Sequence, residues 1–344
     1  MRNLAKKAIA LLVAGVLTMG LVTGCGVDNE ATVAKVGDVE ISLGVANFYA
    51  RYQQSMYETY YSSYYGDAMW STEIEEGKTM EADVKEHTME SIQNLYLMDA
   101  HAKDYSIALT DDENAAIDKA VAKFMKKNDK SVLKKISGDE EIVKEVFRLL
   151  TLESKVYEAM IADVNREVSD DEAAQKLMGY ASFAYSSTDA EGNTVDLTDE
   201  QKADLKKKAE EFLKKAKKTK KAEDLEALAK EYGVTWTKDT AFDAESTSPA
   251  AEVVKAVDKI KKEGKFASLI ETETGLYVAQ LISKFDRKAT DSKKDEIISE
   301  RENERYEALL KEWREATTIT VDEKAWAQVD FDDISVLMKV EEQK

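Results

Sequence analysis

Residues 225–232 read Leu-Glu-Ala-Leu-Ala-Lys-Glu-Tyr, and Gly233 follows them directly. Apolar residues at helical spacing that end at a glycine predict a short helix. The next stretch, residues 234–242, alternates between apolar and polar side chains, which is typical of a strand. A helix that is followed by a strand indicates a mixed α/β region here. The segments before and after this region are predicted to be helical, so the chain combines helical and α/β parts.

The mixed α/β pattern extends over residues 178–285. Its order is strand, long helix, helix, strand, helix, strand, strand. The expected elements are a strand at 180–185, a lysine-rich helix that Thr198 caps, a helix at 223–232, a strand at 234–242, a helix from Pro249 to near Gly264, and strands at 266–270 and 276–282.

Helices are expected on both sides of this insert. A hairpin around Gly37 precedes a helix capped by Ser42, and Thr110 begins a capping box of the Thr-x-x-Glu type. Ser137 and Ser169 repeat that signal. After the insert come a helix at 295–316 and a short strand at 317–321. The fold class is therefore α+β, mostly helical, with one α/β insert.

Composition excludes several classes of protein. The 344 residues contain one proline and 14 glycines, which argues against an all-β sandwich with many tight turns. A net charge of −19 argues against nucleic acid as a partner. One cysteine cannot form an intrachain disulfide or a thiolate zinc site. His87 and His101 would lie about 21 Å apart on one helix, too far to share an ion. No cofactor and no metal is expected.

The first 24 residues have the three parts of a secretory signal peptide, namely basic residues, an apolar run and small residues before the cut. The sequence Leu-Val-Thr-Gly-Cys ends at Cys25 and resembles the lipobox of bacterial lipoproteins. That resemblance implies lipidation of Cys25, a tether at 25–31, and a position on the outer face of a bacterial plasma membrane. The alternative is an ordinary signal peptide that is followed by an incidental cysteine.

The insert resembles the parvulin fold. The helix at 225–232 is similar to the family's F-x-x-L-A-x-x-Y helix, residues 252–264 to its helix that ends in K-x-G, and residues 274–278 to its T-x-x-G-Y-H-I-I strand. The hairpin, the N-terminal helices and the returning C-terminal helix resemble the chaperone domain of PrsA and SurA foldases.

This resemblance implies a domain organisation and a function. A helical chaperone domain would comprise 32–170 and 287–344, and a parvulin-like domain would comprise 171–286. The protein would then be a lipid-anchored chaperone that holds unfolded, newly exported proteins. A homodimer is a further option for its assembly.

The resemblance also indicates where a parvulin site would lie. The two usual histidines fall at Phe183 and Tyr277, and the proline pocket falls at Val253 and Asp258. The family's glycine-rich segment is absent, and no histidine follows His101. We therefore expect weak or lost peptidyl-prolyl isomerase activity, with Asp258 placed unfavourably in an apolar pocket.

Three questions stay open at the level of sequence: the function of the chain, the role of the tyrosines and the role of the lysine-rich stretch. The insert could be an active isomerase with a divergent pocket, or the whole chain an anchored solute-binding or adhesion lipoprotein. The seven tyrosines at 49–65 could form a client-binding surface, or Phe48, Tyr52, Met56 and Tyr60 could form a core stripe. The lysine-rich stretch 202–221 could meet anionic lipid or wall polymer, or be a solvated helix face.

Overall fold

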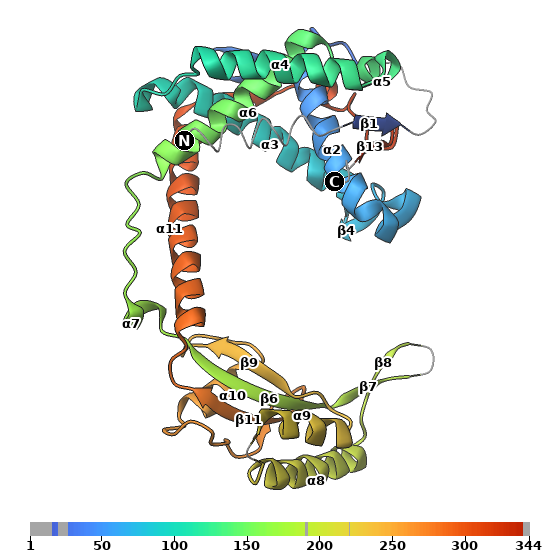
Figure 1. Cartoon of the computed structure of the whole chain (residues 1–344). Helices are drawn as coiled ribbons and strands as arrows, with labels where there is room; N and C mark the ends of the chain where they lie inside the picture. The colour runs from blue at the N-terminus through green and yellow to red at the C-terminus, as the bar shows by residue number, and fades with distance from the viewer. Residues whose placement is uncertain (1–15, 20–26, 190–191, 220, 340–344) are drawn as a thin grey trace. The chain divides into compact units, whose positions relative to one another are not determined.

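The computed structural model describes residues 16–19, 27–189, 192–219 and 221–339 (Figure 1). The chain divides into two units. The helical unit comprises Met1–Val164 and Glu302–Lys344, and the α/β unit comprises Asn165–Arg301. The α/β unit is therefore a continuous stretch inserted into a discontinuous helical one. Helix α11, Arg287–Ala316, contributes residues to both units. Whether the insert folds alone, with the expected limits 171–286, stays a prediction.

The helical unit is built mainly from α2, α3, α4 and α6, and strands β1 and β13 lie side by side in it (Figure 1). Its elements outside α11 are β1 Val16–Met19, β2 Thr32–Val36, β3 Val39–Ser42, α2 Leu43–Tyr65, η1 Gly66–Ala68, β4 Glu73–Glu75, β5 Lys78–Thr79, α3 Met80–His101, η2 Ala102–Tyr105, α4 Asp111–Lys127, α5 Lys130–Lys135, α6 Glu140–Met160, β12 Ile319–Val321, α12 Glu323–Trp326 and β13 Val336–Lys339.

The α/β unit contains a four-stranded sheet in the order β10-β11-β6-β9, in which all neighbouring strands are antiparallel. The predicted order of strands and helices and the predicted fold class are confirmed. The elements are α7 Asp170–Ala173, β6 Lys176–Ala184, β7 Ser186–Thr188, β8 Thr194–Asp196, α8 Asp199–Ala216, α9 Ala222–Glu231, β9 Thr237–Phe242, α10 Ala251–Asp258, β10 Ile270–Glu271 and β11 Gly275–Ser283.

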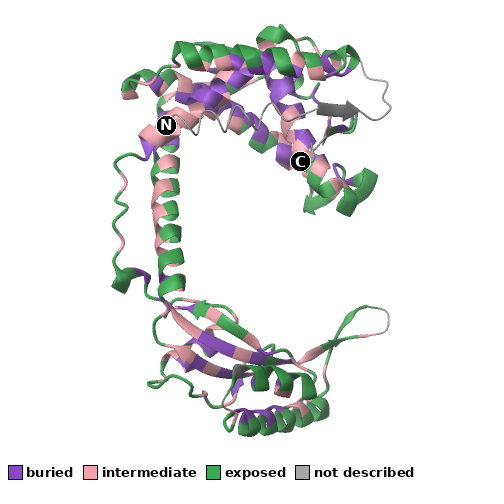
Figure 2. Cartoon of the chain, in the orientation of Figure 1, coloured by how far each residue is buried: buried purple, intermediate pink, exposed green. Residues whose placement is uncertain are grey.

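The core of the helical unit joins both ends of that discontinuous unit. Buried residues of α2, α3, α4 and α6 pack with Trp313 of α11 and with Phe331 and Val336 near the end of the chain. Phe331 is 1% exposed and Val336 is fully buried. Figure 2 shows these buried residues gathered inside the unit. The C-terminal residues therefore complete this core.

The sheet of the α/β unit buries a different cluster on each face. Helices α8 and α9 cover one face, where Ala181 and Phe183 pack with Phe212. Helix α10 covers the opposite face, where Met178 packs with Val253. The two clusters follow from the alternation of side chains along β6.

Several local signals are confirmed by the backbone. Ser42, Thr110 and Thr198 cap their helices, and the last two form complete capping boxes. Ser137 is not a cap, which corrects the prediction. Asp139 holds the N-cap position of α6, while the Ser137 hydroxyl donates to Asn29 Oδ1 at 2.6 Å. Ser137 has φ +55°, and its side chain joins two segments of the chain instead.

Element lengths differ from the predictions at several places. Helix α11 begins at Arg287 rather than at 295, and strand β9 begins at Thr237 rather than at 234. Helix α10 ends at Asp258 rather than near Gly264, and the strand expected at 266–270 is reduced to β10 with a single bridge from Phe266 to Gln280. The loop expected after Tyr185 contains the hairpin β7–β8. No helix in the described residues is long and apolar enough to span a membrane.

Candidate functional site

The sheet face that packs on α10 carries most of the positions expected for a parvulin site. Val253 of α10 is fully buried in this cluster, and Tyr277 of β11 packs against it half-buried. Asp258 is the last residue of α10. The structure therefore brings these three predicted residues to one face of the sheet.

Phe183 does not join them, and its assignment is corrected. It is 2% exposed on the α8 face, where its ring centroid lies 5.7 Å from that of Phe212. Phe183 pairs with Leu276 in the ladder, so Tyr277 is one residue away and points to the other face. Tyr277 pairs with Ser182 of β6 in the ladder, and its ring lies beside that of Tyr180, with centroids 6.1 Å apart.

We expected Asp258 to be placed unfavourably in an apolar pocket. The structure corrects this expectation, because the Asp258 carboxylate has an ion-pair partner. Lys176 Nζ of β6 lies 2.6 Å from Asp258 Oδ1, and both side chains are 34% exposed. A partly solvated ion pair of this kind needs no apolar surroundings and costs little to form. Asp258 therefore closes the end of α10 onto the sheet.

This face offers phenol hydroxyls and no imidazole. Both histidines of the chain lie on α3 of the helical unit. The His101 ring stacks on Trp313 at 4.2 Å, and its Nδ1 lies 2.8 Å from Asp104 Oδ2. His87 is exposed. A pair of imidazoles therefore cannot form on this sheet.

A second candidate surface lies at the C-terminal end of α2. Of the seven tyrosines at 49–65, Tyr49 is 6% exposed and Tyr52 is half-buried. The remaining five are all exposed, with Tyr60 at 64% and Tyr64 at 84%. The predicted core stripe therefore includes Phe48 but not Tyr60. Glu58 is the last residue of α2 that is buried.

These exposed tyrosines continue an aromatic series that begins in the core. The Phe331 and Trp70 ring centroids are 4.7 Å apart, those of Trp70 and Tyr57 are 6.1 Å apart, and those of Tyr57 and Tyr61 are 6.0 Å apart. Because Trp70 and Phe331 are buried, they hold the first exposed rings in place. Contacts with these rings restrict the rotamers of Tyr57 and Tyr61. We call the five exposed tyrosines of α2 the platform: Tyr57, Tyr60, Tyr61, Tyr64 and Tyr65.

Strand β13 lies beside this platform and uses its two edges differently. On one edge, Val336 N donates to Glu58 Oε2 at 2.7 Å and Met338 N donates to Thr59 Oγ1 at 3.0 Å. The other edge pairs antiparallel with β1, in a register from Val16 opposite Lys339 to Met19 opposite Val336. Side chains of α2 therefore replace a strand on one edge and leave the other for an extended segment.

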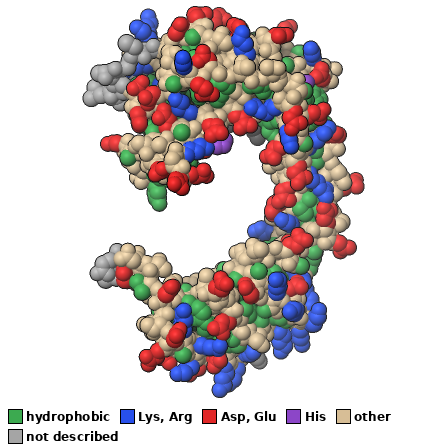
Figure 3. Space-filling view, turned by 180° about the vertical axis from the view of Figure 1, so that it is seen from behind, with side chains coloured by type: hydrophobic (Ala, Val, Ile, Leu, Met, Phe, Trp, Pro, Cys, Tyr) green, Lys and Arg blue, Asp and Glu red, His purple; other side chains and the backbone are tan. Residues whose placement is uncertain are grey.

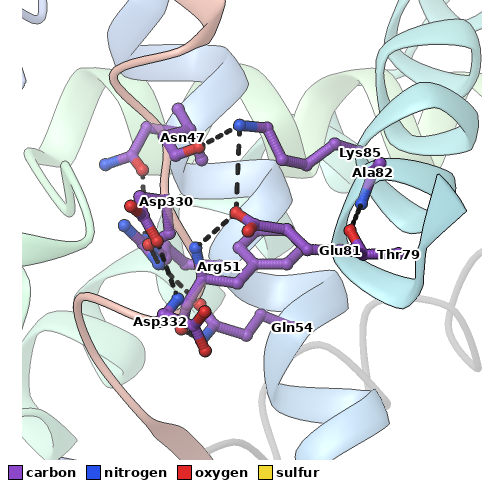
Figure 4. Close-up of polar contacts among 11 residues, drawn as sticks. Asn47, Arg51, Gln54, Thr79, Glu81, Ala82, Lys85, Asp330 and Asp332 are labelled. Atoms are coloured by element: carbon purple, nitrogen blue, oxygen red, sulfur yellow. Dashed lines mark hydrogen bonds and ion pairs between the residues drawn. The ribbon is translucent and has the colours of Figure 1, made fainter. Parts of the chain in front are cut away.

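A group of buried and half-buried polar residues holds the C-terminal segment in this position (Figure 4). We call Arg51, Gln54, Glu58, Glu81 and Lys85 the clasp. Arg51 donates to the Asp330 carbonyl at 2.8 Å, Gln54 donates to the Phe331 carbonyl at 2.9 Å, and Lys85 donates to the Val329 carbonyl. Glu81 accepts from Phe331 N at 2.8 Å. The clasp replaces the backbone ladder that this segment lacks.

Burial shifts the ionisation of the clasp. It lowers the pKa of Arg51 to about 10, and it also lowers the pKa of Lys85. Burial raises the pKa of Glu81, and the neighbouring carboxylates Asp330 and Asp332 raise it further. One carboxylate oxygen from each of Glu81, Asp330 and Asp332 lies within 4.8 Å of the other two. Since Glu81 already accepts from Phe331 N and lies 3.9 Å from Lys85 Nζ, we assign the group to chain fixation.

The remaining sequence candidates fall elsewhere. Cys25 lies outside the described residues. Helix α8 places its lysines on the surface, and the basic side chains gather along the lower edge of the α/β unit in Figure 3. Lys206 and Lys215 form ion pairs with Glu271 and Glu231. Such pairing is what a solvated helix face shows.

One family model matches part of the chain. The family model of the SurA-like N-terminal domain matches residues 1–163, so the predicted resemblance to PrsA- and SurA-type foldases is confirmed for this part of the chain. No curated protein matches the chain in sequence.

Solved structures that align with the chain include three bacterial foldases. The PrsA foldase from Lactococcus lactis is 16% identical, over 87% of this chain and 98% of that one, with a TM-score of 0.33. The peptidylprolyl isomerase PrsA from Bacillus cereus is 14% identical, over 88% and 98%, with a TM-score of 0.32. The peptidylprolyl isomerase PrsA from Bacillus anthracis is 19% identical, over 66% and 96%, with a TM-score of 0.28.

Sequence reasoning missed the clasp and strand β13. A signal was present in α2, where Arg51, Gln54 and Glu58 recur at helical spacing on the side that also carries core residues. Long polar residues on a buried helix face need buried partners. Their partners are backbone groups about 280 residues away, for example Gln54 with Ile334, and no local pattern indicates them.

Proposed function

We propose that this protein is a lipid-anchored extracytoplasmic chaperone that holds unfolded exported proteins, and that its parvulin-like unit has weak or no isomerase activity. The match of residues 1–163 to the SurA-like N-terminal domain supports the chaperone class. The observation that carries the proposal is the tyrosine platform beside strand β13, whose one edge pairs only with residues 16–19.

The platform and the strand suit an unfolded chain because both can bind a client whatever the amino-acid sequence of that client is. Tyrosine rings contact apolar side chains through their faces and keep a hydroxyl for water or backbone groups. A strand edge offers backbone hydrogen bonds to any extended segment. In the structure that edge holds residues 16–19, Val-Leu-Thr-Met, which belong to the predicted signal peptide. Removal of residues 1–24 would open the edge to a client.

The test is suppression of aggregation of an unfolded client by the mature chain. Changing Tyr60, Tyr61 and Tyr64 together to Ser should weaken suppression several-fold without a change in thermal unfolding, because all three are exposed. The matched control changes Val39, Val195 and Phe285 to Ser, three exposed apolar residues outside the platform. Equal suppression by the tyrosine variant and the parent would contradict the proposal.

The anchor is tested separately. Cys25→Ala should release the protein into the medium or leave its precursor uncut, because the thioether to lipid cannot form. Cell fractionation and mass spectrometry of the product measure both outcomes. A variant that stays on the membrane at the normal mature mass would show that Cys25 is not the anchor.

The low isomerase activity has a structural test as well. The pair Tyr180→His and Tyr277→His places both imidazoles on the α10 face, whereas Phe183→His and Tyr277→His places them on opposite faces. A protease-coupled assay on a proline peptide should therefore give more activity for the first pair than for the second. Activity of the unaltered chain at an ordinary parvulin rate would replace our proposal with the enzyme alternative.

A further inference from the structure

A groove of about 650 Å³ runs along α3 in the helical unit and shares no lining residue with the platform. The α3 residues that line it extend from Thr79 to Gln93, and the end of α11, β12 and α12 form its other side. Over that stretch a helix rises about 21 Å. An extended segment of about six residues has the same length. The groove therefore has the dimensions of a binding site for a short stretch of polypeptide.

The floor of the groove is apolar. Met89 of α3 and Trp326 of α12 line it and are 5% and 6% exposed, and Val321 of β12 lines it half-buried. A lysine or arginine side chain can lay its apolar stem on such a floor and keep its charged end in water. The charges that border the floor then decide whether a cation is accepted.

The charged residues that line the groove are mainly acidic: Glu81, Glu86, Glu90, Glu323, Lys85 and Arg314. Both cations have partners inside the protein. Lys85 donates to the Val329 carbonyl and lies 3.9 Å from a Glu81 oxygen (Figure 4). The Arg314 guanidinium donates to Gln93 Oε1 at 2.7 Å. Among the described residues, neither cation forms an ion pair with the other three carboxylates of the groove.

Two of these carboxylates are available to a ligand. Glu90 and Glu323 are exposed, and in the described part of the chain neither forms an ion pair or accepts a side-chain hydrogen bond. Glu86 shares Lys78 with Asp83, at 2.9 and 2.7 Å, so these three residues keep one negative charge. A cation that binds Glu90 or Glu323 would therefore displace no existing partner.

The segments that border the groove do not cancel its charge. Residues 78–93 contain four acidic and two basic residues, and residues 311–315 together with 322–324 contain four acidic and three basic ones. Residues 330–333 add three aspartates, and the cation of α2 that lies near them is Arg51. The excess of negative charge at the groove is thus larger when its neighbours are counted.

We propose that this groove binds an extended polypeptide segment that carries lysine or arginine. The charged ends of those side chains lie at Glu90 and Glu323, and their stems cover Met89 and Trp326. That the segment belongs to an unfolded client rests on the proposed function. The platform contains no charged side chain, so the groove adds a preference for basic segments that the platform does not have.

The test measures the binding of a labelled peptide to the mature chain. The probe is a capped peptide of alanine, leucine and lysine, and its matched control has glutamine in place of each lysine. Fluorescence anisotropy should show tighter binding of the lysine peptide, and 1 M salt should remove the difference because it screens exposed charges. Carbodiimide coupling joins a lysine amine to a carboxylate, and mass spectrometry should find the peptide on Glu90 and Glu323.

A paired substitution gives the second measurement. Glu90→Gln with Glu323→Gln should weaken binding of the lysine peptide by roughly fivefold, which corresponds to about 0.5 kcal/mol for each of two exposed ion pairs. Thermal unfolding should not change, because both side chains are exposed. The control Glu200→Gln with Glu211→Gln makes the same change in net charge at exposed positions of α8, and it should leave binding as it is.

Equal binding of the two peptides, coupling only to carboxylates outside the groove, or an unaltered affinity of the Glu90 and Glu323 variant would overturn the proposal. The variant that changes Tyr60, Tyr61 and Tyr64 should bind the lysine peptide as the parent does. Peptide binding without suppression of aggregation would contradict the proposed function and support the groove. Suppression of aggregation without peptide binding would contradict the groove and support the proposed function.

Discussion

The two units of the chain complete their structures in different ways. The helical unit buries Arg51, Gln54 and Glu58, which are 4%, 0% and 4% exposed. The polar residues that are buried in the described part of the α/β unit, Gln175 and Thr290, are uncharged. A sheet satisfies its own backbone through its ladder, while the C-terminal segment of the helical unit needs side chains for that purpose. The buried charged residues Arg51 and Glu58 therefore lie where the C-terminal segment has no strand ladder to bind its backbone groups.

The largest effect should come from the isosteric change Glu58→Gln. Glu58 accepts from Gln54 Nε2, Trp70 Nε1, the Ser335 hydroxyl and Val336 N. An amide would turn a donor toward two of these donors, at about 1–3 kcal/mol for each. Urea unfolding should show a loss of roughly 2–6 kcal/mol. A loss below about 0.5 kcal/mol, within the range of ordinary surface substitutions, would mean that the clasp does not hold β13.

An intermediate effect should come from Glu153 of α6, and it should depend on pH. Burial raises the pKa of Glu153 from 4.5 to about 7. The folded state therefore binds the proton more tightly than the unfolded state, and stability falls as pH rises from about 4.5 to about 7. Glu153→Gln should flatten this fall and stabilise the protein at pH 8 by about 1–3 kcal/mol. Thermal unfolding at pH 4 and pH 8 measures the difference, and parallel pH curves would contradict it.

The smallest effect should come from Lys176→Met in the α/β unit. The Lys176–Asp258 pair is short, but each side chain is 34% exposed. Water screens such a pair, so its removal should cost no more than about 1 kcal/mol. Chemical unfolding of the full chain, followed through Trp236 of this unit, provides the measurement. A loss of unfolding free energy as large as that expected for Glu58→Gln would contradict the view that only the helical unit depends on buried charge.

The sequence predicted what short-range patterns control. The caps at Thr110 and Thr198 and the hairpin at Gly37 depend on a few neighbouring residues, and all are present. The element order of the insert also follows from apolar periodicity.

Long-range partners could not be read in this way. Ser137 has the residue type of a cap, yet Asn29, 108 residues away, determines its role. The face occupied by Phe183 depends on the register between β6 and β11, and a shift of one residue exchanges the two faces. The same limit applies to β13, where Val336 N donates to Glu58, which lies 278 residues away in the chain.

The clasp also has a consequence for the order in which the protein matures. A chain emerges from its N-terminus, so residues 165–301 are complete before residues 329–336 exist. The α/β unit can therefore acquire its structure first, while the helical unit waits for Phe331 and Val336 to close its core. Such late, distant contacts slow folding. During that interval this unit is itself an incompletely folded polypeptide with exposed apolar surface, the same kind of species that it is proposed to protect.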